Sequence, residues 1–214
     1  MQHEETSAPG DAVPLASAAP AVRKRPKPGE RRVQILQALA AMLEQPGAER
    51  VTTAALAARL DVSEAALYRH FASKAQMFEG LIDFIEQSVF SLVNQITERE
   101  APGQDQAARI IAMLVQFAEK NPGMTRVMVG DALVYENERL QSRMNQFFDK
   151  IESTLRQALR GAAAGEGSAT PTVDAQVRAS ALTAFLVGRL QRYARSGFRR
   201  APSEHLEPSV ALML

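Results

Sequence analysis

Hydrophobic residues recur every three or four positions along most of this chain. The first such segment contains Ile35, Leu36, Leu39, Met42 and Leu43. A longer one runs from 77 to 96, and others cover about 104–120, 140–159 and 182–193. This spacing places the apolar side chains on one face of an α-helix. We find no convincing alternation of apolar and polar residues of the kind that a half-buried strand shows, so the pattern predicts an all-α fold.

Proline, glycine and small polar residues mark the breaks between these helices. Pro46-Gly47 and Pro102-Gly103 are each expected to end a helical segment. Residues 161–172 (GAAAGEGSATPT) are interpreted as a flexible loop between two helices. Residues 1–29 are rich in alanine, proline and serine and contain few large apolar side chains. They cannot bury enough surface to offset the entropy lost on ordering, so we expect a disordered tail with a basic end.

The segment from 52 to 74 (TTAALAARLDVSEAALYRHFASK) has the pattern of two short helices joined by a tight turn. Thr52 or Thr53 can cap the first helix, and Ser63 can cap the second. Asp61 lies in the turn, where a left-handed backbone is often needed, and aspartate adopts that conformation more readily than most residues. This spacing is typical of a helix-turn-helix, which places its second helix in the major groove of DNA.

Side chains that suit DNA gather in this same segment. Hydroxyl groups can bond phosphate oxygens, as can histidine, lysine and the backbone amides at a helix start. Ala65 permits contact with a thymine methyl group, and Arg69 can recognise guanine. Taken singly, Tyr68 also fits a half-buried core position, His70 a surface histidine and Arg69 a solvated charge, but the segment as a whole favours DNA. The predicted DNA-binding residues are Thr52, Thr53, Ser63, Glu64, Ala65, Tyr68, Arg69, His70 and Lys74.

Composition narrows the possible functions further. The chain has 214 residues, no cysteine and three histidines far apart in sequence. This excludes thiol catalysis and disulfides and disfavours a histidine metal site. No carboxylate pair, nucleophile–base arrangement or phosphate-binding loop stands out, so we expect a protein that is not an enzyme and needs no cofactor. No apolar run approaches about 20 residues, so no membrane segment is expected.

The formal net charge of +1 conceals an uneven distribution. Residues 50–74 carry a net +2, whereas residues 75–100 carry −4. The basic run at 23–32 fits either an arm along DNA phosphates or a solvated tail that adds only non-specific affinity. A second basic run fits a solvated face near a dimer interface better than a nucleic-acid patch. It comprises Arg189, Arg192, Arg195, Arg199 and Arg200.

Short motifs in the helix-turn-helix segment resemble the DNA-binding domain of the TetR family. They are Leu56-Ala57, Val62-Ser63, Leu67-Tyr68-Arg69-His70-Phe71 and Ser73-Lys74. Asp61 departs from the family pattern, which usually has glycine at that position.

The resemblance implies a TetR-like architecture with two parts. Residues 30–74 would form an N-terminal three-helix DNA-binding domain. Residues 75–214 would form a helical domain for dimerisation and partner binding. The expected partner is double-stranded DNA with a palindromic site, bound by a homodimer, with one or two dimers per site left open.

Similarity extends beyond the DNA-binding segment to one branch of this family. The matching stretches include 81–86 (LIDFIE), 119–126 (EKNPGMTR) and 139–160 (RLQSRMNQFFDKIESTLRQALR). They resemble the nucleoid occlusion factors, and the resemblance implies a cytoplasmic, nucleoid-associated protein. Such a protein binds chromosomal palindromes and, on DNA, antagonises assembly of the tubulin-like division protein FtsZ. The alternative is a ligand-responsive TetR-family transcriptional repressor, which requires a pocket with convergent polar groups in the second domain.

The same resemblance implies a docking site for the C-terminal tail of FtsZ between the fourth and fifth helices. Phe84 lies beside the main apolar stripe, so we expect the partial exposure that a peptide anchor needs, although an edge of the core also fits. Lys120 equally suits the C-terminus of a helix, and Asn121 a turn. The matching positions are Phe84, Met113, Gln116, Lys120 and Asn121.

Overall fold

The computed structural model of this chain describes residues 29–45, 51–165 and 167–214. Every regular element within these ranges is helical, which confirms the all-α prediction. Residues 1–28 of the predicted tail and the expected break at Pro46-Gly47 lie outside the described residues. The elements are α1 (Glu30–Leu43), α2 (Thr53–Arg59), α3 (Glu64–Tyr68), α4 (Lys74–Arg99), α5 (Gln104–Lys120), α6 (Pro122–Met128), the 3-10 helix η1 (Asp131–Leu133), α7 (Glu138–Gly165), α8 (Pro171–Arg195) and α9 (Leu206–Ala211).

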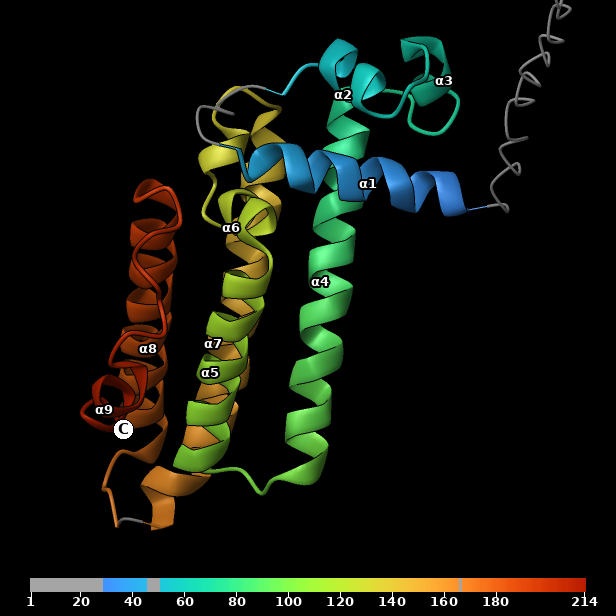
Figure 1. The fold of residues 1–214 in the computed structure, drawn as a ribbon. Coiled ribbons are helices and arrows are strands. Elements are labelled where there is room, and N and C mark those ends of the chain that lie inside the picture. Colours follow the sequence, from blue (N-terminus) through green and yellow to red (C-terminus); the bar gives the residue numbers. More distant parts are fainter. Residues whose placement is uncertain (1–28, 46–50, 166) are drawn as a thin grey trace, which may run out of the picture.

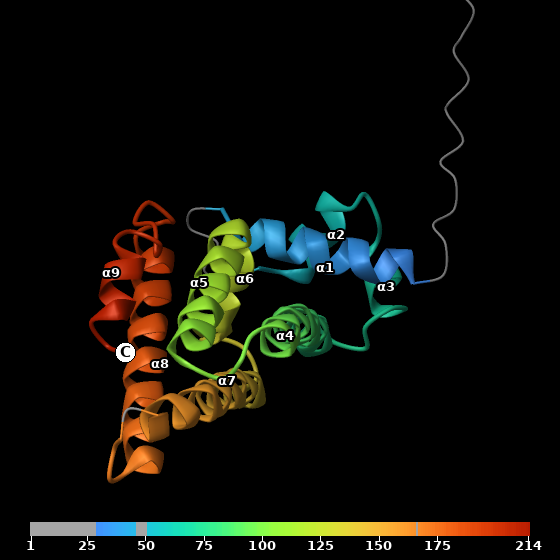
Figure 2. The same cartoon turned by 90° about the horizontal axis from the view of Figure 1, so that it is seen from below.

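The helices form a small head on an elongated body. We call α1–α3 the head and α4–α9 the body. Figure 1 shows α2 and α3 at one end of the molecule, with α4, α5, α7 and α8 running away from them. In the view from below, α5 lies between α4 and α8 (Figure 2). The helix α4 has 26 residues and is the element of the body that follows the head in the sequence.

One continuous hydrophobic core links the head to the body. Ile35 and Leu39 of α1 are buried, as are Phe78 and Leu81 in the first turns of α4. These residues belong to the same cluster as Leu114 in the central helix α5. Burial of apolar surface is therefore shared between the two parts, and it fixes the direction in which α4 leaves the head.

The apolar stripe expected between residues 140 and 159 is buried, as predicted. Leu140, Met144, Phe147 and Ile151 are fully enclosed between α7 and its neighbours. The longest shared packing surface in the molecule is the hairpin of α7 and α8. None of the helices in the described ranges is both long enough and apolar enough to cross a membrane.

The prediction of a flexible loop over residues 161–172 was wrong at both ends, because residues 161–165 belong to α7 and residues 171–172 to α8. The helix α7 continues through Gly161 to Gly165, because three alanines favour helix and Ala163 is fully buried. Pro171 then begins α8, where its missing amide hydrogen costs nothing. The short helix α9 was not predicted, because its six residues span less than two helical turns and show no periodic stripe.

Candidate nucleic-acid interface

The turn between α2 and α3 has the geometry that the sequence predicts. The hydroxyl oxygen of Thr52 accepts a hydrogen bond from the amide of Ala55 at 3.2 Å. That of Ser63 accepts one from the amide of Ala66 at 3.3 Å. Asp61 adopts a left-handed conformation with a φ of 53°, so aspartate takes the place of the glycine usual at this position. These features confirm the expected caps and turn.

The outer face of α3 is solvent-exposed over its whole length. Leu67 is buried against the head, which turns the residues around it outward. The side chain of Tyr68 is 43% exposed, so it is not a core aromatic. The other exposed residues on or beside this helix are Ser63, Glu64, Ala65, Arg69 and His70. The short α3 thus presents hydroxyl, carboxylate, methyl and guanidinium groups on one surface.

Three of the predicted DNA-binding residues are joined by hydrogen bonds. The Tyr68 hydroxyl donates to the Thr53 hydroxyl at 3.5 Å, and Thr53 donates to the Glu64 carboxylate at 2.5 Å. This chain connects the start of α2 with both ends of α3. These hydrogen bonds orient the side chains of Glu64 and Tyr68 in the protein without DNA.

Lys74 is placed differently from the other predicted residues. Its ammonium group is half-buried and pairs with the carboxylate of Glu136, which lies just before α7. It also lies 5.7 Å from the centre of the Phe78 ring. A phosphate contacting Lys74 must therefore compete with Glu136 for the ammonium group.

Arg32 belongs to the basic run at 23–32, but its side chain packs against other residues of the head and is not a free arm. Its guanidinium donates to the backbone carbonyl of His70 at 2.5 Å and lies 4.1 Å from the centre of the Phe71 ring. These contacts tie α1 to the end of α3. Residues 23–28 of the basic run lie outside the described residues.

A row of ion pairs that was not predicted from the sequence joins α4 to α7. Arg143 bonds Asp83 at 2.9 Å and Glu86 at 2.6 Å, and Arg139 bonds Glu79 at 2.6 Å. Burial alone would lower the pKa of Arg143, but these hydrogen bonds and charges outweigh it and raise the pKa. The acidic side of α4 is thus neutralised by α7. The sequence contains a signal for these pairs, because the acidic residues of α4 and the arginines of α7 each recur every three or four residues and so lie on one face of their helix.

The residues matched to an FtsZ-binding site lie on two neighbouring helices, α4 and α5. Phe84 is 44% exposed on α4, as expected. Gln116 and Lys120 are exposed on α5, whereas Met113 is half-buried and packs against the core. Asn121 donates to the carbonyl of Phe117 at 2.7 Å and ends α5, which also fits its expected place in a turn.

The interior of the body is packed with apolar side chains. The described buried polar side chains are Gln106, Thr125 and Thr183, and each bonds to a backbone carbonyl. Their polar groups satisfy local backbone and do not converge on a shared space. This arrangement weighs against the convergent polar pocket that a ligand-responsive repressor requires.

Comparison with known proteins extends the likeness over most of the chain. Residues 35–81 match the bacterial regulatory proteins of the tetR family, and residues 105–214 match the family described as tetracyclin repressor-like, C-terminal domain. The nucleoid occlusion factor SlmA of Photobacterium profundum is 50% identical over 182 residues, covering 85% of this chain and 92% of that protein. SlmA of Vibrio cholerae is 49% identical over 184 residues, covering 86% and 93%.

Solved structures show the same fold at much lower identity. The fatty acid degradation regulator FadR of Bacillus halodurans superposes with a TM-score of 0.71 at 13% identity, covering 88% of this chain and 97% of that one. A TetR transcriptional regulator of Legionella pneumophila gives 0.68 at 14%, covering 90% and 100%. Together with the relatives at half identity, this places the chain in the TetR family and, within it, among the nucleoid occlusion factors named SlmA.

Proposed function

We propose that this protein is a nucleoid-associated nucleoid occlusion factor. It binds palindromic double-stranded DNA as a homodimer and, while bound, antagonises FtsZ assembly. The observation that carries the proposal is identity of about one half to SlmA proteins across both head and body. A shared fold alone does not imply a shared function, so the proposal rests on sequence identity over 85–88% of this chain.

In the proposed complex, α3 enters the major groove. Glu64, Ala65 and Arg69 face the base edges, where arginine recognises guanine and a carboxylate accepts from cytosine. The remaining predicted residues contact phosphates and set the register. They are Thr52, Thr53, Ser63, Tyr68, His70 and Lys74. In a two-fold dimer the two α3 helices would contact half-sites about 34–36 Å apart.

The outer face of α8 is the proposed dimer contact. Val173 and Val177 are 59% and 62% exposed there, and Ala181 and Ala184 continue the same side of the helix. Exposed apolar side chains at helical spacing are typical of a face that packs against a second helix. Light scattering should show a dimer for the native chain and a monomer for Val177→Asp.

The FtsZ tail is proposed to bind between α4 and α5. Phe84 offers an exposed aromatic anchor, and Lys120 offers a cation to an acidic peptide. Gln116 and Met113 lie about one and two turns before Lys120 on α5, and Asn121 ends that helix. These residues belong to α4 and the end of α5 and not to α3, so we propose that DNA and FtsZ can be bound together.

The decisive experiment measures FtsZ polymer by sedimentation with this protein, with and without a palindromic duplex. We expect less polymer when protein and duplex are both present and little effect from either alone. No DNA-dependent change in polymer would overturn the proposal.

Matched variants separate the two surfaces. Phe84→Ala should retain DNA affinity but lose the effect on FtsZ, and Tyr68→Ala should lose both. Leu212→Ala is the control, because it removes a 90% exposed apolar side chain at the end of α9, which belongs to neither proposed surface. A Phe84→Ala variant that inhibits FtsZ as strongly as the control would contradict the proposed tail site.

A further inference from the structure

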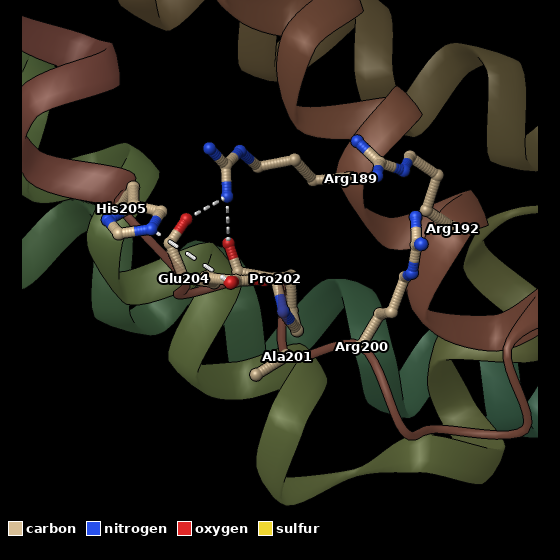
Figure 3. Close-up of a pocket in the computed structure, with 7 residues that line it drawn as sticks. All are labelled: Arg189, Arg192, Arg200, Ala201, Pro202, Glu204 and His205. Carbon is tan, nitrogen blue, oxygen red and sulfur yellow. Dashed lines mark hydrogen bonds and ion pairs between the residues drawn. The ribbon is translucent and has the colours of Figure 1, made fainter.

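A surface pocket of about 250 Å³ lies between the C-terminal part of α8 and the segment that follows it (Figure 3). Arg189 and Arg192 line it from α8, and Arg200 lines it from the following segment. Glu204 and His205 stand at its far side. The sequence favours a solvated face for these arginines, but Arg189 does not fit that prediction.

Arg189 holds in place the segment that forms the far side of this pocket. Its guanidinium donates to the carbonyl oxygens of Pro202 at 3.0 Å and Glu204 at 2.5 Å, and to the Ser209 hydroxyl at 3.0 Å. The amide of Ser203 donates to the carboxylate of Glu119 on α5 at 3.1 Å. Side chains from two helices thus hold the segment in one position.

The backbone of this segment is also unusual. Gly197, Phe198 and His205 all have positive φ, with values of 62°, 65° and 51°. Phenylalanine and histidine rarely adopt this conformation, which persists only where the surroundings determine it. The shape of the pocket is therefore specified by the fold.

The pocket carries an excess of positive charge. Among the described residues, the guanidinium groups of Arg192 and Arg200 have no hydrogen bond or ion pair, and that of Arg189 bonds only neutral oxygens. The one carboxylate in the lining is that of Glu204, which lies 3.9 Å from the His205 ring nitrogen. Three cations thus face one anion at this place.

We propose that this pocket binds a small phosphate-bearing anion, with Arg192 and Arg200 as its ligands and Arg189 as their support. Guanidinium groups bond phosphate oxygens in pairs, and a doubly charged group matches the excess charge. The volume is below the roughly 300–1,000 Å³ of sites for drug-sized ligands, so a compound such as a diphosphate fits better than a large cofactor.

The DNA backbone is a second source of phosphate, but the location of the pocket disfavours it. Both ribbon views show α8 and α9 on the opposite side of the bundle from α2 and α3, and Figure 1 shows that α8 ends at the same end of the molecule as the head (Figures 1 and 2). The half-site bound by the α3 of this chain therefore lies away from Arg192 and Arg200. A free phosphate compound is the ligand we infer.

Calorimetric titration of the full chain with inorganic pyrophosphate at low ionic strength tests this site. We expect saturable binding at one site per chain. Replacing Arg192 and Arg200 together by alanine should weaken it by about tenfold or more per arginine. Lack of saturable heat with the native chain would overturn the proposal.

Arg195→Ala is the matched control for Arg192→Ala. Arg195 is an exposed arginine on the same helix that does not line the pocket. The control should bind pyrophosphate like the native chain, and equal losses in both variants would show diffuse charge attraction and refute the site. Arg200→Ala alone, in the exposed segment, gives the same test if the double variant melts early.

A parallel titration with duplex DNA distinguishes the two sources of phosphate. The double variant should bind duplex as well as the Arg195→Ala control does. A selective loss of duplex affinity, without pyrophosphate binding by the native chain, would assign these arginines to DNA and contradict the proposal.

Discussion

Gly123 of α6 lies directly against the main chain of Ala40 in α1. A β-carbon at position 123 would be 2.0 Å from the Ala40 carbonyl oxygen. No side chain can move to relieve that contact, because the opposing atom belongs to a helix backbone. This close approach is one of the points at which the body holds the head in place.

Gly123→Ala should therefore destabilise the protein by about 1–3 kcal/mol, or separate α6 from α1. Denaturant unfolding gives the loss of stability, and DNA titration reports on the position of the head. Gly165→Ala is the control, because no heavy atom lies within 4 Å of its added β-carbon. Equal stability of the two variants would show that α6 can move away from α1 without loss of stability, and would contradict the prediction.

The left-handed turn at Asp61 gives a second prediction. Asp61→Gly and Asp61→Ala both remove the carboxylate, so they differ only in how well they tolerate a φ of 53°. The glycine variant should be the more stable by about 1–2 kcal/mol, because only alanine carries the β-carbon penalty. Comparing the free energies of unfolding of the two variants checks this. Equal values would mean that the turn changes shape.

Glu136 is expected to restrain DNA binding through Lys74. Glu136→Gln should release the ammonium group to a phosphate, raising affinity for all duplexes. The slope of log affinity against log salt should steepen by up to about 0.9, the value for one further phosphate contact. Titrations at several salt concentrations measure both quantities.

Glu79→Gln is the comparison for Glu136→Gln. It also removes one negative charge, but from the pair with Arg139 along the body. If both variants raise DNA affinity equally, the effect of Glu136 is one of net charge and the competition for Lys74 does not exist.

The bridging position of Arg143 between α4 and α7 should make it important for stability. Arg143→Met leaves Asp83 and Glu86 without their partner and should cost about 1–2 kcal/mol in low salt. Arg109→Met should cost less than about 0.5 kcal/mol, because its side chain is 66% exposed and pairs only with Glu100. Chemical denaturation at low and high salt separates the two, and a similar small loss in both would show that the α4–α7 row adds little.

Tyr193 should ionise above the ordinary pH range of a tyrosine side chain. Burial raises its pKa above the ordinary value of about 10, and the charges of Glu119 and Glu44 raise it further. The folded state thus favours the neutral hydroxyl, so this contribution to stability is complete below about pH 10 and is lost as the pH rises further.

Ultraviolet absorbance of tyrosinate measures this titration. Tyr193→Phe should remove the part of the titration that occurs above the ordinary range of tyrosine. The variant should also lose less stability than the native chain above pH 10. If the native chain and the Tyr193→Phe variant, both folded, show the same titration above that range, the raised pKa is refuted.

Much of the head was predictable because its signals are local. Capping by Thr52 and Ser63 and the left-handed turn at Asp61 depend on residues within a few positions of one another. The exposure of Phe84 followed from its place beside the apolar stripe of one helix. The roles of these residues in binding DNA and FtsZ are proposals that the experiments above will test.

By itself, the sequence determined the helical class, the helix-turn-helix and the buried stripes, because helical period and capping act over short distances. Only the tertiary structure decided that Lys74 faces Glu136, that Arg143 bridges two acids of α4, and that Arg189 shapes a pocket. The first two contacts join residues that are remote in sequence, and the third joins α8 to the irregular segment that follows it. Charge alone does not choose a partner, and the packed core decides which charges come within reach.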